Sequence, residues 1–299
     1  MRNTYKVAAI GLGAMGYGMA QSVLRAGHDV WGVDVRDDAM DRFRAEGGQP
    51  GSVDDVLDQI DVAMVVVLNA DQTEAVLFGE NGIVPRMRAG AVVMACATVS
   101  PDFARRMEAA CATHGIHYLD APISGGAARA ANGDLTIMVS GAPDALQGAR
   151  ATLDATARDV FEMGDAAGAG SAIKAVNQIL AGVHIATMAE AMAFGMTQGI
   201  SPEKFMEILP TCGGTSWMLE NRGPHIVDAD YTPLSAVDIW PKDLSIVLDI
   251  AKSARMPAPL TAAALQQFIA ASGMGYGRED DAAVIKVYAR SAGLTLPGE

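Results

Sequence analysis

Short apolar runs alternate with helical patterns through the first half of the chain. Apolar runs typical of strands occupy residues 7–10, 28–35, 62–68, 91–95 and 117–119. Between them, the apolar spacing of three to four residues that indicates helices occurs at 15–26, 39–46, 73–77 and 101–114. Strands that alternate with helices predict an α/β domain with a parallel, doubly wound sheet. We predict that residues 135–139 and 160–161 form a hairpin that closes this domain.

The pattern changes after Gly164. From Gly170 onward the β-branched runs disappear, and long stretches rich in Ala, Met and Leu take their place. Such a pattern predicts an all-α second domain. We therefore divide the chain into an α/β domain over residues 1–165 and an all-helical domain over residues 166–299, joined at the glycine-rich segment 164–170.

Composition narrows the classes of partner. The 299 residues carry a formal net charge of −13, which argues against binding to nucleic acid or to an anionic membrane. No apolar run approaches the roughly 20 residues that cross a bilayer, and no signal-like stretch is present, so we expect a cytoplasmic protein. Three widely spaced cysteines, Cys96, Cys111 and Cys212, suit neither a disulfide framework nor a zinc site, so we expect no metal.

A glycine-rich turn follows the first strand directly. In the sequence GLGAMG, Gly11 permits a tight turn, Gly13 lets a pyrophosphate approach the backbone, and Gly16 allows close packing of helix and strand. A helix that begins at this turn would stabilise the phosphate charge. The motif lies between a strand and a helix, the context of a Rossmann dinucleotide-binding domain. We expect cofactor contacts from Gly11, Leu12, Gly13, Met15 and Gly16.

An acidic residue after the second strand bears on the choice of cofactor. Asp34 lies eighteen residues after Gly16, where a carboxylate accepts hydrogen bonds from the ribose of NAD and repels the 2′-phosphate of NADP. The sequence therefore favours NAD over NADP. Arg36 either softens that preference or is simply a solvated arginine. Leu68 and Thr98 follow later strands at the same carboxyl edge of the sheet. They are either ligand contacts or ordinary loop residues.

The fifth strand leads into a second turn with exposed backbone amides. Ser124, Gly125 and Gly126 offer a hydroxyl and two unencumbered N–H groups, which suit a carboxylate. On spacing alone, a plain turn explains these residues equally well.

A polar face on the first helix of the second domain is the other candidate for chemistry. Lys174, Asn177 and Gln178 share one face, and apolar residues such as Val176 and Leu180 occupy the opposite one. Lys174 falls in about the first turn, where the helix dipole lowers the pKa of an ammonium group toward the range useful for proton transfer. A solvated lysine is the alternative. The abundance of apolar side chains on these helices indicates a homodimer or homotetramer.

Taken in order, GLGAMG, DAPISGG, GAGSAIKAVNQ and PKDL resemble the β-hydroxyacid dehydrogenase family over essentially the whole chain. The resemblance implies an NAD(P)-binding first domain, a long linking helix, an all-helical second domain and catalysis by Lys174. It implies that Asn177 binds substrate, that Ser124, Gly125 and Gly126 hold the substrate carboxylate, and that Thr98 and Lys242 contact the cofactor. The family often has Asn-Asn after the lysine, so Asn177-Gln178 leaves the role of Gln178 open.

Within the family, the stretches CGGTSWMLENRGPHI, DYTPLSAVDIW and GREDDAAVIKVY resemble the branch that oxidises the C2 hydroxyl of L-threonate to 2-dehydro-L-erythronate. The expected substrate is thus a small anionic sugar acid, whose extra hydroxyls His184, Asn221, Arg222 or a neighbouring subunit would bind. The alternatives are 3-hydroxyisobutyrate oxidation and the reduction of tartronate or succinate semialdehyde. A non-catalytic nucleotide-sensing protein is a rival of another class, against which the retained Lys174 and the acidic charge argue.

Overall fold

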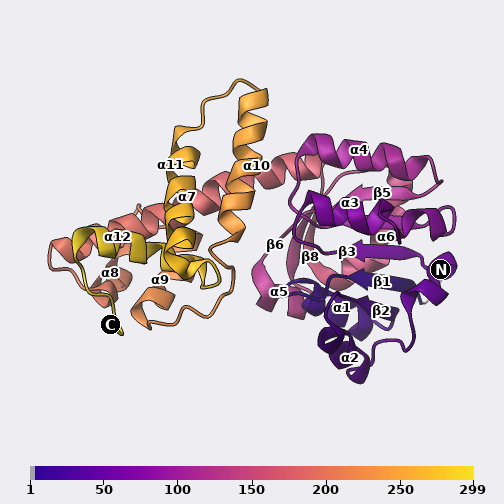
Figure 1. The fold of residues 1–299 in the computed structure, drawn as a ribbon, viewed down its shortest axis with the longest axis horizontal. Helices are drawn as coiled ribbons and strands as arrows, with labels where there is room; N and C mark the ends of the chain where they lie inside the picture. The colour runs from indigo at the N-terminus through magenta and orange to yellow at the C-terminus, as the bar shows by residue number, and fades with distance from the viewer. Residues whose placement is uncertain (1–3) are drawn as a thin grey trace. The chain divides into compact units, whose positions relative to one another are not determined.

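The computed structural model describes residues 4–299, which form two compact units. One unit extends up to Lys174, and the other is Ala175–Glu299. The division falls within α7 (Ala169–Thr197), a single helix of 29 residues that Figure 1 shows as one continuous coil.

The first unit is built on a five-stranded parallel sheet. Its strands follow the order β2-β1-β3-β4-β5, and every neighbouring pair is parallel. Their bounds are β1 (Lys6–Ile10), β2 (Asp29–Val33), β3 (Val62–Val65), β4 (Val92–Ala95) and β5 (His117–Asp120). The order reverses at β1, so the predicted doubly wound α/β fold is confirmed.

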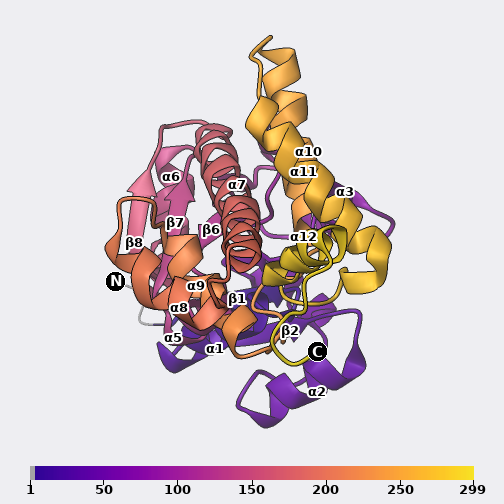
Figure 2. The same cartoon turned by 90° about the vertical axis from the view of Figure 1, so that its left-hand side faces the viewer.

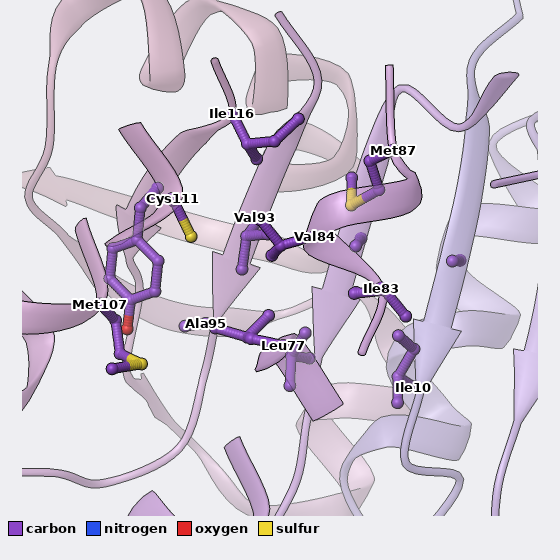
Figure 3. Packing of buried hydrophobic residues seen from close by; sticks show 14 of the residues in the cluster. Ile10, Leu77, Ile83, Val84, Met87, Val93, Ala95, Met107, Cys111 and Ile116 are labelled. Carbon is purple, nitrogen blue, oxygen red and sulfur yellow. The ribbon is translucent and has the colours of Figure 1, made fainter. Parts of the chain in front are cut away.

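Helices cover both faces of this sheet because successive strand residues point to opposite sides. In β3, Ala63 and Val65 pack in one buried cluster, while Val62 and Met64 pack in another. Figure 3 shows part of the first cluster, to which Leu77 also belongs. Three short helical turns contribute residues to it: η1 (Val53–Asp55), η2 (Leu57–Gln59) and η3 (Val84–Arg86). The helices around the sheet are α1 (Gly16–Arg25), α2 (Asp37–Ala45), α3 (Ala70–Phe78), α4 (Pro101–Ala112), α5 (Gly126–Asn132) and α6 (Pro143–Thr156).

A second, three-stranded sheet corrects one prediction. β7 (Leu135–Val139) pairs in parallel with β8 (Ala157–Glu162), so the hairpin expected from these two segments is wrong. Parallel neighbours require a crossover connection, and α6 supplies it. Pro143 occupies the first turn of α6, and Ala145, Ala149 and Leu153 form its buried stripe. The antiparallel neighbour of β7 is β6 (Ile123–Ser124).

The second unit consists of helices, which confirms the predicted all-α domain. After α7 come α8 (Pro202–Ile208), α9 (Trp217–Val227), α10 (Ile239–Ser253), α11 (Pro259–Ala271) and α12 (Ile285–Ala292), with short turns η4 (Leu209–Thr211), η5 (Ser272–Tyr276) and η6 (Asp281–Val284). Helices α10 and α11 lie side by side (Figures 1 and 2), and Trp240 of α10 stacks on Phe268 of α11. Both rings belong to the core, together with Met188, Met192 and Ile285.

Helix α7 is also long and apolar enough to span a membrane by length and composition, the one such helix among residues 4–299. Half of its most apolar window is buried inside the protein, and a single helix of this kind is weak evidence for a membrane span.

One buried carboxylate fixes the start of α7. Asp120, the last residue of β5, accepts hydrogen bonds from the backbone N–H groups of Gly168 (3.0 Å) and Ser171 (2.8 Å) and from the Ser171 hydroxyl (2.7 Å). The Ser140 hydroxyl also donates to Asp120 (3.1 Å) and accepts from the N–H of Gly170 (2.9 Å). These bonds satisfy N–H groups that the first turn of a helix leaves without partners. They join β5, the end of β7 and α7 into one structure.

Gly170 is required for this close approach. A Cβ atom at Gly170 would lie 2.5 Å from the Met138 carbonyl oxygen and 3.1 Å from that of Asp120. We predict that Gly170→Ala lowers the free energy of unfolding by about 1–3 kcal/mol, because backbone on both sides leaves no room for a methyl group. Urea unfolding measures this. The matched control is Gly213→Ala, where a Cβ would meet nothing within 4 Å and we expect a change within about 0.5 kcal/mol; equal effects of the two would refute the explanation.

Candidate active site

The candidate site of the first unit lies along one edge of the parallel sheet. Because all five strands run the same way, their carboxyl ends meet at that edge. Gly11 follows β1 directly, Asp34 follows β2, and Ser124 follows β5 after three residues. The remaining predicted contacts, Leu68 and Thr98, lie in the loops after β3 and β4, with Leu68 exposed and Thr98 half-buried.

The three glycines of the GLGAMG turn have different surroundings. A Cβ at Gly11, whose φ is +93°, would lie 2.2 Å from the Val66 carbonyl oxygen, and a Cβ at Gly16 would lie 1.9 Å from that of Gly11. These two glycines are therefore needed for the turn itself. A Cβ at Gly13 would meet nothing within 4 Å, so the backbone there is open to a ligand. This is the arrangement a pyrophosphate requires, and the residues present fit a dinucleotide.

Asp34 is tied to the same turn. Its Oδ2 accepts the N–H of Leu12 at 2.7 Å, and its Oδ1 accepts the N–H (3.0 Å) and Nε (3.1 Å) of Arg36. Burial raises the pKa of Asp34, but these hydrogen bonds and the Arg36 charge outweigh it and hold the pKa below its ordinary value. The carboxylate therefore remains charged at neutral pH.

A cavity of about 430 Å³ lies beside the turn. Gly13 and Ala14 line one part of it, and Arg36 lines another. Arg36 is exposed but not merely solvated, because its Nη2 also donates to the Leu12 carbonyl at 3.1 Å. Met15, the residue before α1, is half-buried and packs in the cluster beneath. The cavity has the size and the polar lining that a cofactor moiety needs.

The Ser124 turn contains two glycines with positive φ. Gly125 and Gly126 have φ values of +140° and +79°, which a residue with a side chain rarely adopts. A Cβ at Gly126 would meet nothing within 4 Å, whereas one at Gly125 would lie 3.1 Å from the Arg129 and Leu135 side chains. Ser124 is half-buried and pairs with Thr136 of β7.

The Lys174 side chain reaches this turn. Lys174 is only 8% exposed, and its Nζ donates to the Ile123 carbonyl oxygen at 2.9 Å. Ile123 immediately precedes Ser124, so the amine lies beside the Ser124 turn. The Asp120 anchor at the start of α7 holds the lysine in this position.

The second unit carries a chain of four polar side chains. Asn177 Nδ2 donates to Gln178 Oε1 at 2.9 Å, and Gln178 Nε2 donates to Asp243 Oδ2 at 2.5 Å. Lys242 Nζ donates to the other carboxylate oxygen of Asp243. Asn177 and Gln178 follow Lys174 by three and four residues on α7, which places all three on one face of that helix.

Comparison with known proteins identifies the family. Residues 6–164 match the model of the NAD binding domain of 6-phosphogluconate dehydrogenase, and residues 168–288 match that described as NAD-binding of NADP-dependent 3-hydroxyisobutyrate dehydrogenase. The chain belongs to the β-hydroxyacid dehydrogenase family. It is an NAD-dependent dehydrogenase that acts on a small hydroxyacid.

Relatives and a solved structure match this dehydrogenase over nearly its whole length. L-threonate dehydrogenase of Cupriavidus necator is 50% identical, covering 98% of both chains, and that of Pectobacterium atrosepticum is 44% identical, covering 98% of this chain and 96% of the relative. A crystal structure described as 3-hydroxyisobutyrate dehydrogenase from Salmonella typhimurium is 44% identical, with a TM-score of 0.89 over 95% of this chain and 99% of that one.

Sequence reasoning missed two acids of the dehydrogenase. Asp120 opens the segment DAPISGG and Asp243 follows Lys242 in PKDL, yet neither had a predicted role. For Asp120 the sequence did offer a signal, because an acid ends a buried strand and a glycine-rich helix start follows later in the chain. The first N–H groups of such a helix need acceptors from outside the helix. The role of Asp243 follows only from its hydrogen bond with Gln178, and the sequence does not show that the two residues pair.

Arg222 has partners other than the expected substrate. It is buried, and its Nε donates to Asp281 Oδ1 at 2.6 Å. A second guanidinium nitrogen donates to the Asn221 side chain. The guanidinium is therefore occupied within the helical unit.

Proposed function

We propose that this dehydrogenase oxidises the C2 hydroxyl of L-threonate with NAD, with Lys174 as the general base. The observation that carries the proposal is the 2.9 Å hydrogen bond from Lys174 Nζ to the Ile123 carbonyl. It places an amine beside the Ser124 turn, where the backbone N–H groups of Gly125 and Gly126 would bind the substrate carboxylate together with the Ser124 hydroxyl. A C2 hydroxyl adjoins the carboxylate, so an anchored carboxylate brings it within reach of the lysine.

The proton and the hydride leave the substrate for different acceptors. Lys174, in its neutral form, accepts the proton of the C2 hydroxyl as the C2–H bond breaks, and C2 becomes the carbonyl carbon of 2-dehydro-L-erythronate. Asn177 orients the substrate or the lysine from one turn further along α7. When bound, NAD accepts the hydride.

The residues that would hold NAD are those of the sheet edge. The backbone at Gly11, Leu12, Gly13, Met15 and Gly16 would carry the pyrophosphate and Asp34 the adenosine ribose. Leu68, Thr98 and Lys242 would complete the cofactor contacts. A charged Asp34 opposes a 2′-phosphate, so NAD is the preferred cofactor.

The name of the substrate rests on relatives. Several that match over nearly the whole chain, at 43–50% identity, are named L-threonate dehydrogenase. A second candidate is 3-hydroxyisobutyrate, which the 44% identical crystal structure names. It lacks two of the hydroxyls of threonate, so turnover separates the two candidates.

We predict that L-threonate with NAD gives the highest kcat/KM in a panel of L-threonate, D-threonate, D-glycerate and 3-hydroxyisobutyrate, each assayed with NAD and NADP. A site with polar partners for the extra hydroxyls discriminates against analogues that lack them, here by about tenfold or more. NADH or NADPH absorbance measures each rate, and reactions without acid supply the background. Faster turnover of 3-hydroxyisobutyrate would contradict the proposed substrate.

We also propose that the dehydrogenase is a homo-oligomer. Three large apolar side chains of α7, Val176, Leu180 and Phe194, are 51%, 53% and 67% exposed. At about 100° per residue they fall on one stripe of the helix. Exposed apolar side chains aligned on one face of a helix are typical of an interface between subunits.

The expected assembly is a dimer or tetramer. Sedimentation velocity of the purified protein should show that species, and Leu180→Glu should shift it toward the monomer, because a charge in an apolar interface is costly. A monomer at every concentration would refute the assembly.

A further inference from the structure

A buried polar contact between Gln178 and Asp243 joins α7 and α10 in the second unit. Gln178 is 5% exposed and Asp243 is 2% exposed, and a 2.5 Å hydrogen bond joins Nε2 of the amide to Oδ2 of the carboxylate. A hydrogen bond to a charged group is stronger than one between neutral groups. Its strength fixes the orientation of the Gln178 amide, with Oε1 directed away from Asp243.

Each member of the pair holds one neighbour. Gln178 Oε1 accepts from Asn177 Nδ2 at 2.9 Å, and Asp243 Oδ1 accepts from Lys242 Nζ. We call these four residues, Asn177, Gln178, Asp243 and Lys242, the polar relay. Its middle is buried and its two ends are half-buried. The ends are the residues proposed above to contact substrate and cofactor.

Apolar packing beside the relay also joins the two helices. Gly182 lies one turn after Gln178 on α7, and a Cβ there would lie 2.9 Å from the Trp240 ring and from Leu244 of α10. Trp240 and Leu244 flank Asp243 on α10, and Trp240 Nε1 donates to Asp281 Oδ2 at 2.9 Å.

The apolar packing and the relay have different roles between α7 and α10. Apolar contact at Gly182 already brings α7 and α10 together. A buried carboxylate is a costly way to add stability, since apolar side chains of similar volume often serve as well. The Asp243 carboxylate instead sets the orientation of a neighbouring amide. It fixes the Gln178 amide, which takes one N–H of Asn177 and leaves Asn177 Oδ1 free of that contact.

We propose that Gln178 is a positioning residue for the dehydrogenase reaction, which sets the orientation of the Asn177 amide and is itself held by Asp243. The proposal rests on the proposed function, because Asn177 must contact the reacting groups for its orientation to matter. It assigns a role to the position where the family often has asparagine. The longer glutamine side chain reaches Asp243 across the interface between α7 and α10.

The test is a double-mutant cycle between Gln178 and Asn177, read in kcat with whichever acid of the panel the wild-type enzyme oxidises fastest. Gln178→Met keeps the length of the side chain and removes both hydrogen bonds. We expect it to lower kcat about tenfold or more, since small misplacements cost up to about 10²-fold. In the Asn177→Ala background the same change should lower kcat by no more than about twofold, because residues that act as a unit are not additive.

Two further variants make the test specific. Gln266→Met, an exposed glutamine of α11, is the matched control and should leave kcat unchanged. The swap Q178E/D243N restores an amide–carboxylate pair and should exceed the kcat of Q178E alone, where two buried carboxylates face each other. This comparison serves if Gln178→Met fails to fold.

The outcomes distinguish three cases. Wild-type kcat in Gln178→Met, or an equal loss in both backgrounds with a lowered Tm, would overturn the positioning role and leave only a structural one. No rescue by the swap would also count against it. An Asn177→Ala variant with full activity would refute the proposed function of Asn177, and with it the relay.

Discussion

The arrangement of the first unit depends on the hydrogen bonds of one buried carboxylate. Asp120 ends β5 and precedes the Ser124 turn, and it also accepts two backbone N–H groups at the start of α7. Burial raises the pKa of Asp120, and the hydrogen bonds from Ser171, Gly168 and Ser140 oppose that rise. A single residue thus fixes both the turn that would bind the substrate carboxylate and the helix that carries Lys174. Gly170 makes the approach possible, since any side chain there would strike the backbone.

The α/β fold and the helical unit were predictable because they depend on local patterns. Apolar runs of four to eight residues between helical segments indicate parallel strands, and the loss of such runs after Gly170 indicates helices. The GLGAMG turn was predictable for the same reason, since its glycines lie close together in the sequence, directly between a strand and a helix. Asp34 belongs to this group, and its bond to the Leu12 N–H ties it to the turn.

Most features that sequence reasoning missed depend on distant contacts. The exception is α6, which changes an expected hairpin into a parallel pair and has the local signals of Pro143 in its first turn and a buried apolar stripe. Asp243 and Gln178 are 65 residues apart, and only the packing of α10 against Gly182 brings them together. The partner of Arg222 was missed for the same reason, since Asp281 lies 59 residues away in the sequence. Side chains that could bind a substrate and side chains that bind each other look alike in a sequence.

The central claim is that Lys174, held beside the Ser124 turn, transfers the proton. The most direct test is the single-turnover kinetics of Lys174→Ala. NADH absorbance follows the reaction at saturating concentrations of NAD and of the hydroxyacid substrate. We expect a rate lower by about 10²–10⁴-fold, NAD binding close to that of the wild type, and partial recovery of the rate on addition of methylamine. A Lys174→Ala enzyme that transfers hydride at the wild-type rate would contradict it.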